Sequence, residues 1–312
     1  MNNLDAQIID YLTHCEFQKR LNSKTLKAYK IDLRQFSEFI HISDVADVSS
    51  SVLETYISKL HQLYKPKTVK RKIASVKAFF HYLEYKEIIT INPFNKIQIK
   101  FREPTILPKT IPLPIVESML STIYAYRIQA STTYQRQNAL RDAAIIELLF
   151  ATGIRISELC SLKTSDVNLV DRSILIYGKG SKERRMQIGN DDVLHILTEY
   201  RNSFHDKNNP CSFFFINQNQ TPVSDQAIRR MINKYVSLAA IDLHITPHMF
   251  RHTFVSILLS NPDIGVATVA AEAGHAQPST TLAIYTQVYH KRQDSIRNQM
   301  SETLYKNKNP ER

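Results

Sequence analysis

The 312-residue chain has no tryptophan, three cysteines and six glycines. Cys15, Cys160 and Cys211 form no C-x-x-C pair and no metal-binding spacing, which excludes a disulfide scaffold or a zinc ribbon as the basis of the fold. The scarcity of glycine and proline excludes collagen-like and low-complexity classes. We therefore expect reduced thiols and an ordinary packed core.

Long apolar runs are also missing. The most apolar stretch, 143–152, is interrupted by Glu147 and is far shorter than the roughly 20 residues of a membrane span. The first residues, MNNLDAQIID, are polar and acidic, unlike a signal peptide. We expect a soluble, cytoplasmic protein without membrane contact.

Three common catalytic signatures are absent: G-x-S-x-G, the Rossmann fingerprint and an acidic metal cluster. The segment GKGSKER at 178–184 is too short for a P-loop, so ATP binding is not indicated. We expect no metal and no cofactor.

The charge is strongly positive, with 40 Lys and Arg against 29 Asp and Glu, a net charge of +11. A surplus of this kind favours a polyanionic partner, because neutralised phosphates release their condensed counterions. The alternative is a basic protein without such a partner. The length favours two domains.

Residues 1–100 have a helical pattern. The first helix with a clear apolar face follows Asn22 or Ser23, the second follows Ser50 and Ser51, and the third begins near Pro66. The third helix carries a run of basic residues without an acid: Lys65, Lys67, Lys70, Arg71, Lys72 and Lys77. We interpret this run as a DNA-contacting face rather than a merely solvated one, and the segment as a helical DNA-binding domain.

Prolines accumulate between Asn92 and Pro114 and predict a linker over 101–112. Beyond it, we predict a mixed α/β domain over 113–312, so that the chain as a whole is mainly α with a small sheet. Two strands, Ser173–Tyr177 and Arg185–Ile188, are expected to form a hairpin. Helices are expected at 191–204, 224–240 and 246–260.

Two segments of this domain predict phosphate contacts. In ATGIRISEL, 151–159, a glycine turn delivers Arg155 to a helix start, and Glu158 is close enough to buttress Arg155 or to cap the helix. In GKGSKER, Lys179 can act as a mobile general acid, and the loop adds Lys182, Arg184 and Arg185 as candidate DNA contacts. Either segment alone could be an ordinary helix start or a basic turn.

Two later segments complete the candidate site. TPHMFRHTF, 246–254, places His248, Arg251 and His252 on one helical face, where the central arginine suits a phosphate better than zinc. AGHAQPSTTLAIYT, 273–286, contains His275 and Tyr285. Each histidine or tyrosine alone would usually be structural.

In this order, Arg155, Lys179, His248, Arg251, His275 and Tyr285 resemble the six-residue signature of the tyrosine recombinases, or phage integrase family, in its Xer-like branch. The segment TLKAYKIDLRQFSEF, 25–39, is similar to the family's SAM-like core-binding domain. The resemblance implies double-stranded DNA as the partner and strand cleavage through a 3′-phosphotyrosyl bond. It also implies a homotetramer on two DNA sites, with a tail helix after Tyr285 that docks on its own or a neighbouring subunit.

The same resemblance implies roles for the residues. Arg155, Arg251 and His275 would hold the non-bridging oxygens, His248 would be the general base for Tyr285, and Lys179 would protonate the leaving 5′ oxygen. Glu158 and His252 would support them.

Two features depart from the family pattern. Tyr285 follows His275 by ten residues where Xer-like members have nine, which keeps Tyr289 as a rival nucleophile, and 128–139 looks like an insertion. Three other functions remain open: DNA relaxation like that of a type IB topoisomerase, a non-catalytic DNA-binding protein of the same fold, and a metal-dependent nuclease.

Overall fold

The computed structural model describes residues 3–99, 108–178, 183–205, 211–274, and singly Ser279, Thr281 and Tyr285. The chain divides into two compact units, Met1–Thr105 and Ile106–Arg312. The division falls within the stretch 101–112 that the prolines predicted as a linker. None of the described helices is long and apolar enough to cross a membrane.

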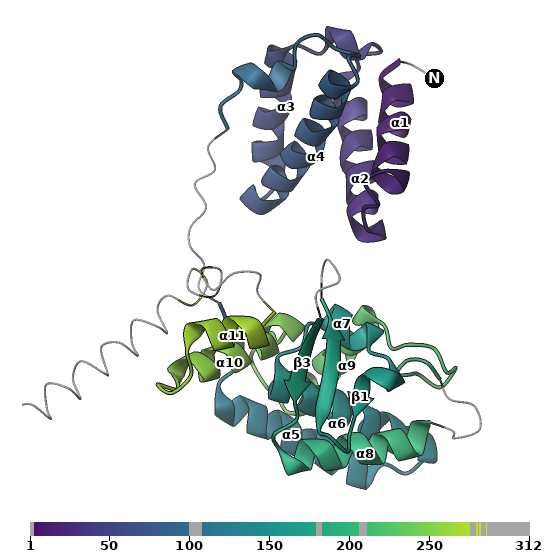
Figure 1. Ribbon diagram of the computed structural model, residues 1–312, viewed down its shortest axis with the longest axis vertical. Helices are drawn as coiled ribbons and strands as arrows, with labels where there is room; N and C mark the ends of the chain where they lie inside the picture. The colour runs from purple at the N-terminus through teal and green to yellow at the C-terminus, as the bar shows by residue number, and fades with distance from the viewer. Residues whose placement is uncertain are drawn as a thin grey trace, which may run out of the picture. The chain divides into compact units, whose positions relative to one another are not determined.

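The first unit is a bundle of helices that pack side by side (Figure 1). Its elements are α1 (Asn3–Phe17), α2 (Ser23–Ile40), η1 (Val45–Asp47), α3 (Ser50–Leu63), α4 (Pro66–Tyr85) and η2 (Pro93–Lys96). Asn22 caps α2 by accepting a hydrogen bond from the Thr25 amide at 2.9 Å, and Pro66 begins α4. The sequence pattern did not predict α1, whose Leu4, Ile8 and Tyr11 complete the core.

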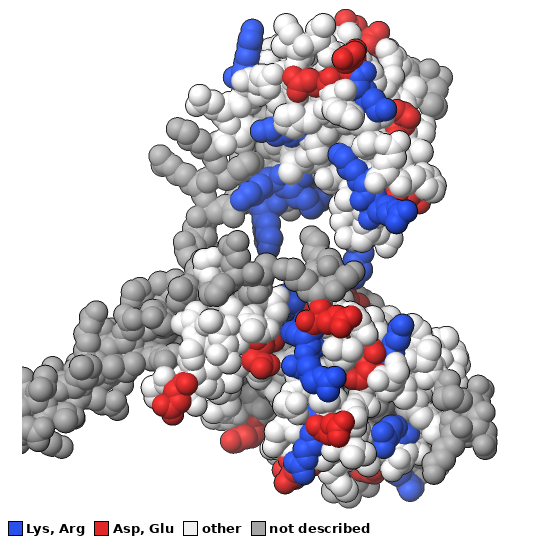
Figure 2. Space-filling model, viewed as in Figure 1, with Lys and Arg blue, Asp and Glu red and all other residues white. Residues whose placement is uncertain are grey.

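The basic run of α4 is divided between surface and core. Lys65, Lys67, Lys70 and Lys77 are exposed, and Figure 2 shows basic side chains gathered where α4 begins. Lys72 is instead buried, and its Nζ lies 3.2 Å from Asp32 of α2; Arg71 also pairs with Asp32. The structure therefore places Lys72 away from the exposed lysines that were predicted with it as DNA contacts, because a buried carboxylate pairs with its ammonium group.

The second unit is built around one long helix, α6. Its elements begin with α5 (Leu113–Gln129), α6 (Thr133–Thr152), α7 (Ile156–Ser161), η3 (Thr164–Asp166), β1 (Val167–Asn168), β2 (Ser173–Tyr177) and β3 (Glu183–Gln187), and continue with α8 (Asp191–Phe204), α9 (Asp225–Leu238), α10 (Pro247–Ser260) and α11 (Val266–Glu272). α6 contacts α5, α8 and α10, and most of its side chains are buried, as its long apolar stretch requires.

A three-stranded antiparallel sheet in the order β1-β2-β3 packs beside these helices (Figure 1). In the β2–β3 pair Ile176 lies opposite Arg184, and Leu175 lies opposite Arg185. Because side chains alternate between the two faces of a strand, Arg184 points toward the core side and Arg185 toward solvent. α11 contacts β3, which brings the end of the described chain beside this strand.

Candidate active site

Gly153 forms the turn that places Arg155. It ends α6 with a φ of +56°, in the left-handed region that glycine adopts without strain. A Cβ at this position would lie 2.6 Å from Cδ1 of Phe254 in α10, so there is no room for a larger residue. The backbone then returns to an extended conformation at Arg155, which caps α7.

The carboxylate of Glu158 binds two arginines. Its Oε1 accepts a hydrogen bond from Arg155 Nη1 at 2.7 Å, and its Oε2 accepts one from the Arg155 amide at 3.0 Å. The guanidinium of Arg184 in β3 adds two more, at 2.7 and 3.1 Å. Burial alone would raise the pKa of Glu158, but Arg184, and after it Arg155, hold that pKa below its usual value.

Two consecutive carbonyl groups bring Arg155 and Arg251 together. Arg155 Nη2 donates to the Gly274 carbonyl at 2.9 Å, and Arg251 Nη2 donates to the Ala273 carbonyl. Arg251 Nη1 also donates to the Gly153 carbonyl at 3.0 Å. Burial, followed by the charges of Arg155 and Arg184, lowers the pKa of Arg251 to about 10. Cations crowded in this way favour an anion beside them.

Tyr285 is buried, with its side chain packed against Val255, Leu259 and Val269. Its hydroxyl oxygen lies 2.5 Å from Nδ1 of His252, one residue after Arg251 in α10. Burial raises the pKa of Tyr285 to about 12, partly offset by Arg251. Burial, followed by the charges of His248 and Arg251, lowers the pKa of His252. Near neutral pH the tyrosine therefore donates the hydrogen bond, and the neutral imidazole accepts it.

His248 occupies a different position from the one expected of a base for Tyr285. Its pKa is lowered by partial burial and then by the charges of Arg229, Arg251 and Arg155. No hydrogen bond joins it to Tyr285 in the part of the chain that the structure describes, and the tyrosine hydroxyl lies on His252 instead. The role of His248 as the base therefore stays a prediction, and the structure offers His252, four residues further along α10, as a second candidate.

Comparisons with known proteins identify the family of this chain. Residues 122–292 match the phage integrase family, and residues 8–87 match the phage integrase N-terminal SAM-like domain. The chain belongs to the tyrosine recombinases of this family.

Relatives of the recombinase cover nearly all of its length. It is 62% identical over 296 residues to a tyrosine recombinase of Agathobacter rectalis, with 95% of this chain and 96% of the relative covered. It is 33% identical over 298 residues to tyrosine recombinase XerC of Thermodesulfovibrio yellowstonii, with 92% and 93% covered. The prediction of a tyrosine recombinase with Xer-like relatives is confirmed.

Solved structures share the fold. A XerH recombinase bound to a palindromic difH substrate, in a post-cleavage complex, is similar with a TM-score of 0.70 at 17% identity, covering 93% of this chain and 83% of that one. A lambda integrase dimer bound to a COC′ core site gives a TM-score of 0.67 at 15% identity, covering 90% and 97%. The predicted fold, mainly helical with a small sheet, is confirmed.

Several predicted site residues of the recombinase fall outside the described residues. Lys179, Lys182, His275 and the rival nucleophile Tyr289 are among them, as is the predicted tail helix. Arg185 is exposed on β3. Arg184 is largely buried and paired with Glu158, a position unlike that of an exposed DNA contact.

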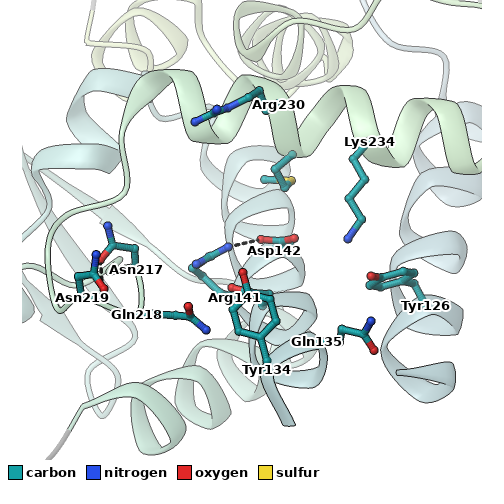
Figure 3. A pocket seen from close by; sticks show the side chains of 12 residues that line it. Tyr126, Tyr134, Gln135, Arg141, Asp142, Asn217, Gln218, Asn219, Arg230 and Lys234 are labelled. Atoms are coloured by element: carbon teal, nitrogen blue, oxygen red, sulfur yellow. Dashed lines mark hydrogen bonds and ion pairs between the residues drawn. The ribbon is translucent and has the colours of Figure 1, made fainter. Parts of the chain in front are cut away.

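The segment 128–139, predicted as an insertion, forms the end of α5, a turn and the start of α6, where Thr132 and Gln135 make a capping box. It borders a polar pocket of about 450 Å³ between α5, α6 and α9 (Figure 3). Lys234 lies 3.7 Å from the ring centroid of Tyr126, and Arg141 pairs with Asp142 at 3.1 Å. This pocket shares no lining residue with the site that contains Arg155, Arg184 and Arg251.

The sequence signalled one contact of the site but not two others. The spacing of Arg155 and Glu158 predicted their mutual contact, and the structure has both the buttress and the cap. Nothing local signalled that Arg184 would share this carboxylate, since 26 residues separate it from Glu158. The choice between His248 and His252 also depended on where residue 285 lies in space, because both histidines share the expected face.

Proposed function

We propose that this recombinase cuts and rejoins double-stranded DNA at specific sites through a transient bond between Tyr285 and a 3′ phosphate. Integration, excision or resolution of DNA segments would be the outcome. The observation that carries the proposal is the placement of Arg155 and Arg251 on consecutive carbonyl groups, with the hydroxyl of Tyr285 on the residue after Arg251. The DNA-bound XerH and lambda integrase structures support DNA as the partner.

The chemistry is a balanced exchange at phosphorus. The hydroxyl oxygen of Tyr285 attacks, the bond to the 5′ oxygen breaks, and the tyrosine proton passes to Nδ1 of His252. We assign the proton that the 5′ oxygen takes up to Lys179. The guanidinium groups of Arg155 and Arg251 stabilise the added negative charge on the non-bridging oxygens, with His275 as a further donor.

Rejoining is the reverse reaction. The phosphotyrosyl bond conserves the energy of the phosphodiester, so attack by a 5′ hydroxyl restores DNA without ATP. We assign charge neutralisation to the arginine pair and not to a metal ion. When the hydroxyl belongs to a second duplex, the product is an exchanged strand.

A covalent trapping experiment tests the proposal. A pool of nicked duplexes with a randomised core is incubated with the protein in EDTA and without ATP, and DNA that stays attached in denaturing detergent is sequenced. We expect a defined sequence to be enriched by the wild type and by Tyr289→Phe, and no adduct with Tyr285→Phe. Adducts that survive in Tyr285→Phe would reassign the nucleophile, and no adduct with wild type would refute the proposed chemistry.

We propose a homotetramer for the complex that joins two DNA sites, and a monomer in the absence of DNA. Support comes from the family resemblance alone, since two cleavages on each of two duplexes require four nucleophiles. Mass measurement of the protein with and without the enriched duplex tests it. A complex with two protein copies for two duplexes would contradict the proposal.

A further inference from the structure

Arg184 connects three parts of the active site. It leaves the core side of β3 shortly after the segment 178–182 that contains Lys179. Its guanidinium binds Glu158 with two hydrogen bonds, at 2.7 and 3.1 Å. Glu158 in turn holds both the side chain and the amide of Arg155. A change at Arg184 therefore reaches Arg155 through one shared carboxylate.

Arg184 also packs against the turn at Gly274. This glycine has a φ of +58°, and a Cβ on it would lie 2.9 Å from Nη1 of Arg184. The Gly274 carbonyl accepts the hydrogen bond from Arg155 Nη2, and the next residue in the chain is His275. The guanidinium of Arg184 thus packs against the same glycine whose carbonyl binds Arg155.

The charges explain why a second arginine is needed. The charges of Arg155 and Arg184 lower the pKa of Arg251, and the carboxylate of Glu158 opposes this effect. If Arg155 alone bound Glu158, a bidentate pair would satisfy its guanidinium and turn it away from a phosphate. Arg184 takes one lone pair of each carboxylate oxygen, which leaves Arg155 a single side-chain bond to Glu158.

We infer that Arg184 is a positioning residue of the cleavage reaction: it sets Glu158 and the Gly274 turn so that Arg155 faces the DNA phosphate. Both of its terminal nitrogens donate to Glu158 and its side chain is largely buried, so we assign its effect to Arg155 rather than to a DNA contact of its own. The inference rests on the proposed function.

The test compares Arg184→Met with Arg185→Met. The two residues are neighbours on β3, but Arg185 is exposed, so the pair matches charge, size and strand while differing in the contact with Glu158. Each variant receives the nicked duplex that wild type traps most efficiently, and single-turnover cleavage is measured beside the DNA dissociation constant at several salt concentrations. Circular dichroism confirms that each variant is folded at the assay temperature.

For Arg184→Met we expect cleavage to fall about 100-fold, as when one preorganised donor is lost, with an unchanged dissociation constant and salt dependence. Arg185→Met should weaken DNA binding and lower the salt slope by about 1, and on saturated DNA its cleavage rate should fall far less than that of Arg184→Met. Arg184→Lys keeps the charge but not the two-point contact with Glu158, so its cleavage rate should lie between those of wild type and Arg184→Met.

Coupling to Glu158 provides the second readout. If Arg184 acts through this carboxylate, Arg184→Met adds little to the cleavage defect of Glu158→Gln. A salt slope reduced by Arg184→Met, full cleavage by that variant, or additive effects with Glu158→Gln would overturn the inference while wild-type trapping still stands. Absence of trapping by wild type would instead refute the proposed function.

Discussion

The hydroxyl oxygen of Tyr285 lies 2.5 Å from Nδ1 of His252, and the partners come from segments 33 residues apart. His252 follows Arg251 in α10, so one helix carries both a phosphate-binding candidate and the tyrosine's hydrogen-bond acceptor. From this contact we predict that cleavage depends on His252 more than on His248.

Replacing His252 with glutamine should slow cleavage by about 100- to 10,000-fold, because glutamine can accept the hydrogen bond but cannot take the proton. His248→Gln is the matched control on the same helix and should have a smaller effect. Single-turnover formation of the covalent adduct on the nicked duplex measures both. A larger defect in His248→Gln than in His252→Gln would return the role of base to His248.

The pH dependence of cleavage follows from the same pair. The pKa of His252 is lowered by burial and by His248 and Arg251, so the neutral imidazole that accepts the proton persists below the usual histidine value of about 6.5. We expect the cleavage rate to stay level from pH 8 down through pH 6.5 and to fall only at lower pH. A rate that is already halved at a pH above 6.5 would contradict this assignment.

Local signals in the sequence were sufficient for much of the fold. Asn22 and Pro66 begin helices where their chemistry predicts, and the predicted strand at Ser173–Tyr177 is present. Capping and strand formation depend on residues within a few positions of one another. The same kind of local spacing predicted that Glu158 would contact Arg155.

Long-range pairings could not be predicted in this way. In the sequence, Lys72 cannot be distinguished from its exposed neighbours. Its partner Asp32 lies 40 residues earlier, in α2, and only the fold brings the two together. Arg184 looked like part of a basic loop, and only the β2–β3 register turns it toward α7. In both cases the charge pattern was read correctly as basic, but the partner came from another element.

Glu158→Gln should destabilise the second unit by about 3–5 kcal/mol at pH 7, because two arginines lose their buried partner. The pKa of Glu158 is held below its unfolded value of about 4.3, so its stabilising contribution is present above that pH and is lost as the pH falls through the folded value. Denaturant unfolding at several pH values should show the difference from wild type shrinking below about pH 4.

The half-exposed pair of Arg127 and Glu199 supplies the control for that measurement. Glu199→Gln should cost less than about 1 kcal/mol, as surface ion pairs do. Equal losses for the two variants would show that Glu158 contributes no more than an ordinary surface carboxylate.

Gly153→Ala should destabilise the protein by about 1–3 kcal/mol and slow cleavage, since the left-handed turn and the contact with Phe254 both exclude a Cβ. Gly189→Ala is the control, because a Cβ there meets no atom within 4 Å, and it should change stability by less than about 0.5 kcal/mol. Thermal unfolding and covalent trapping measure the two effects. A Gly153→Ala variant with wild-type stability and rate would show that the turn does not constrain Arg155.

Lys67→Ala and Lys72→Met should separate a DNA contact from a core ion pair on the same helix. Lys67 is exposed at the start of α4, so its loss should weaken DNA binding and lower the salt slope by about 1. Lys72 is buried against Asp32, so Lys72→Met should leave the slope unchanged and cost stability, because Asp32 loses one of its buried partners. Binding isotherms at several salt concentrations and denaturant unfolding test both variants. A reduced slope in Lys72→Met at unchanged stability would mean that this lysine leaves Asp32 to reach the DNA.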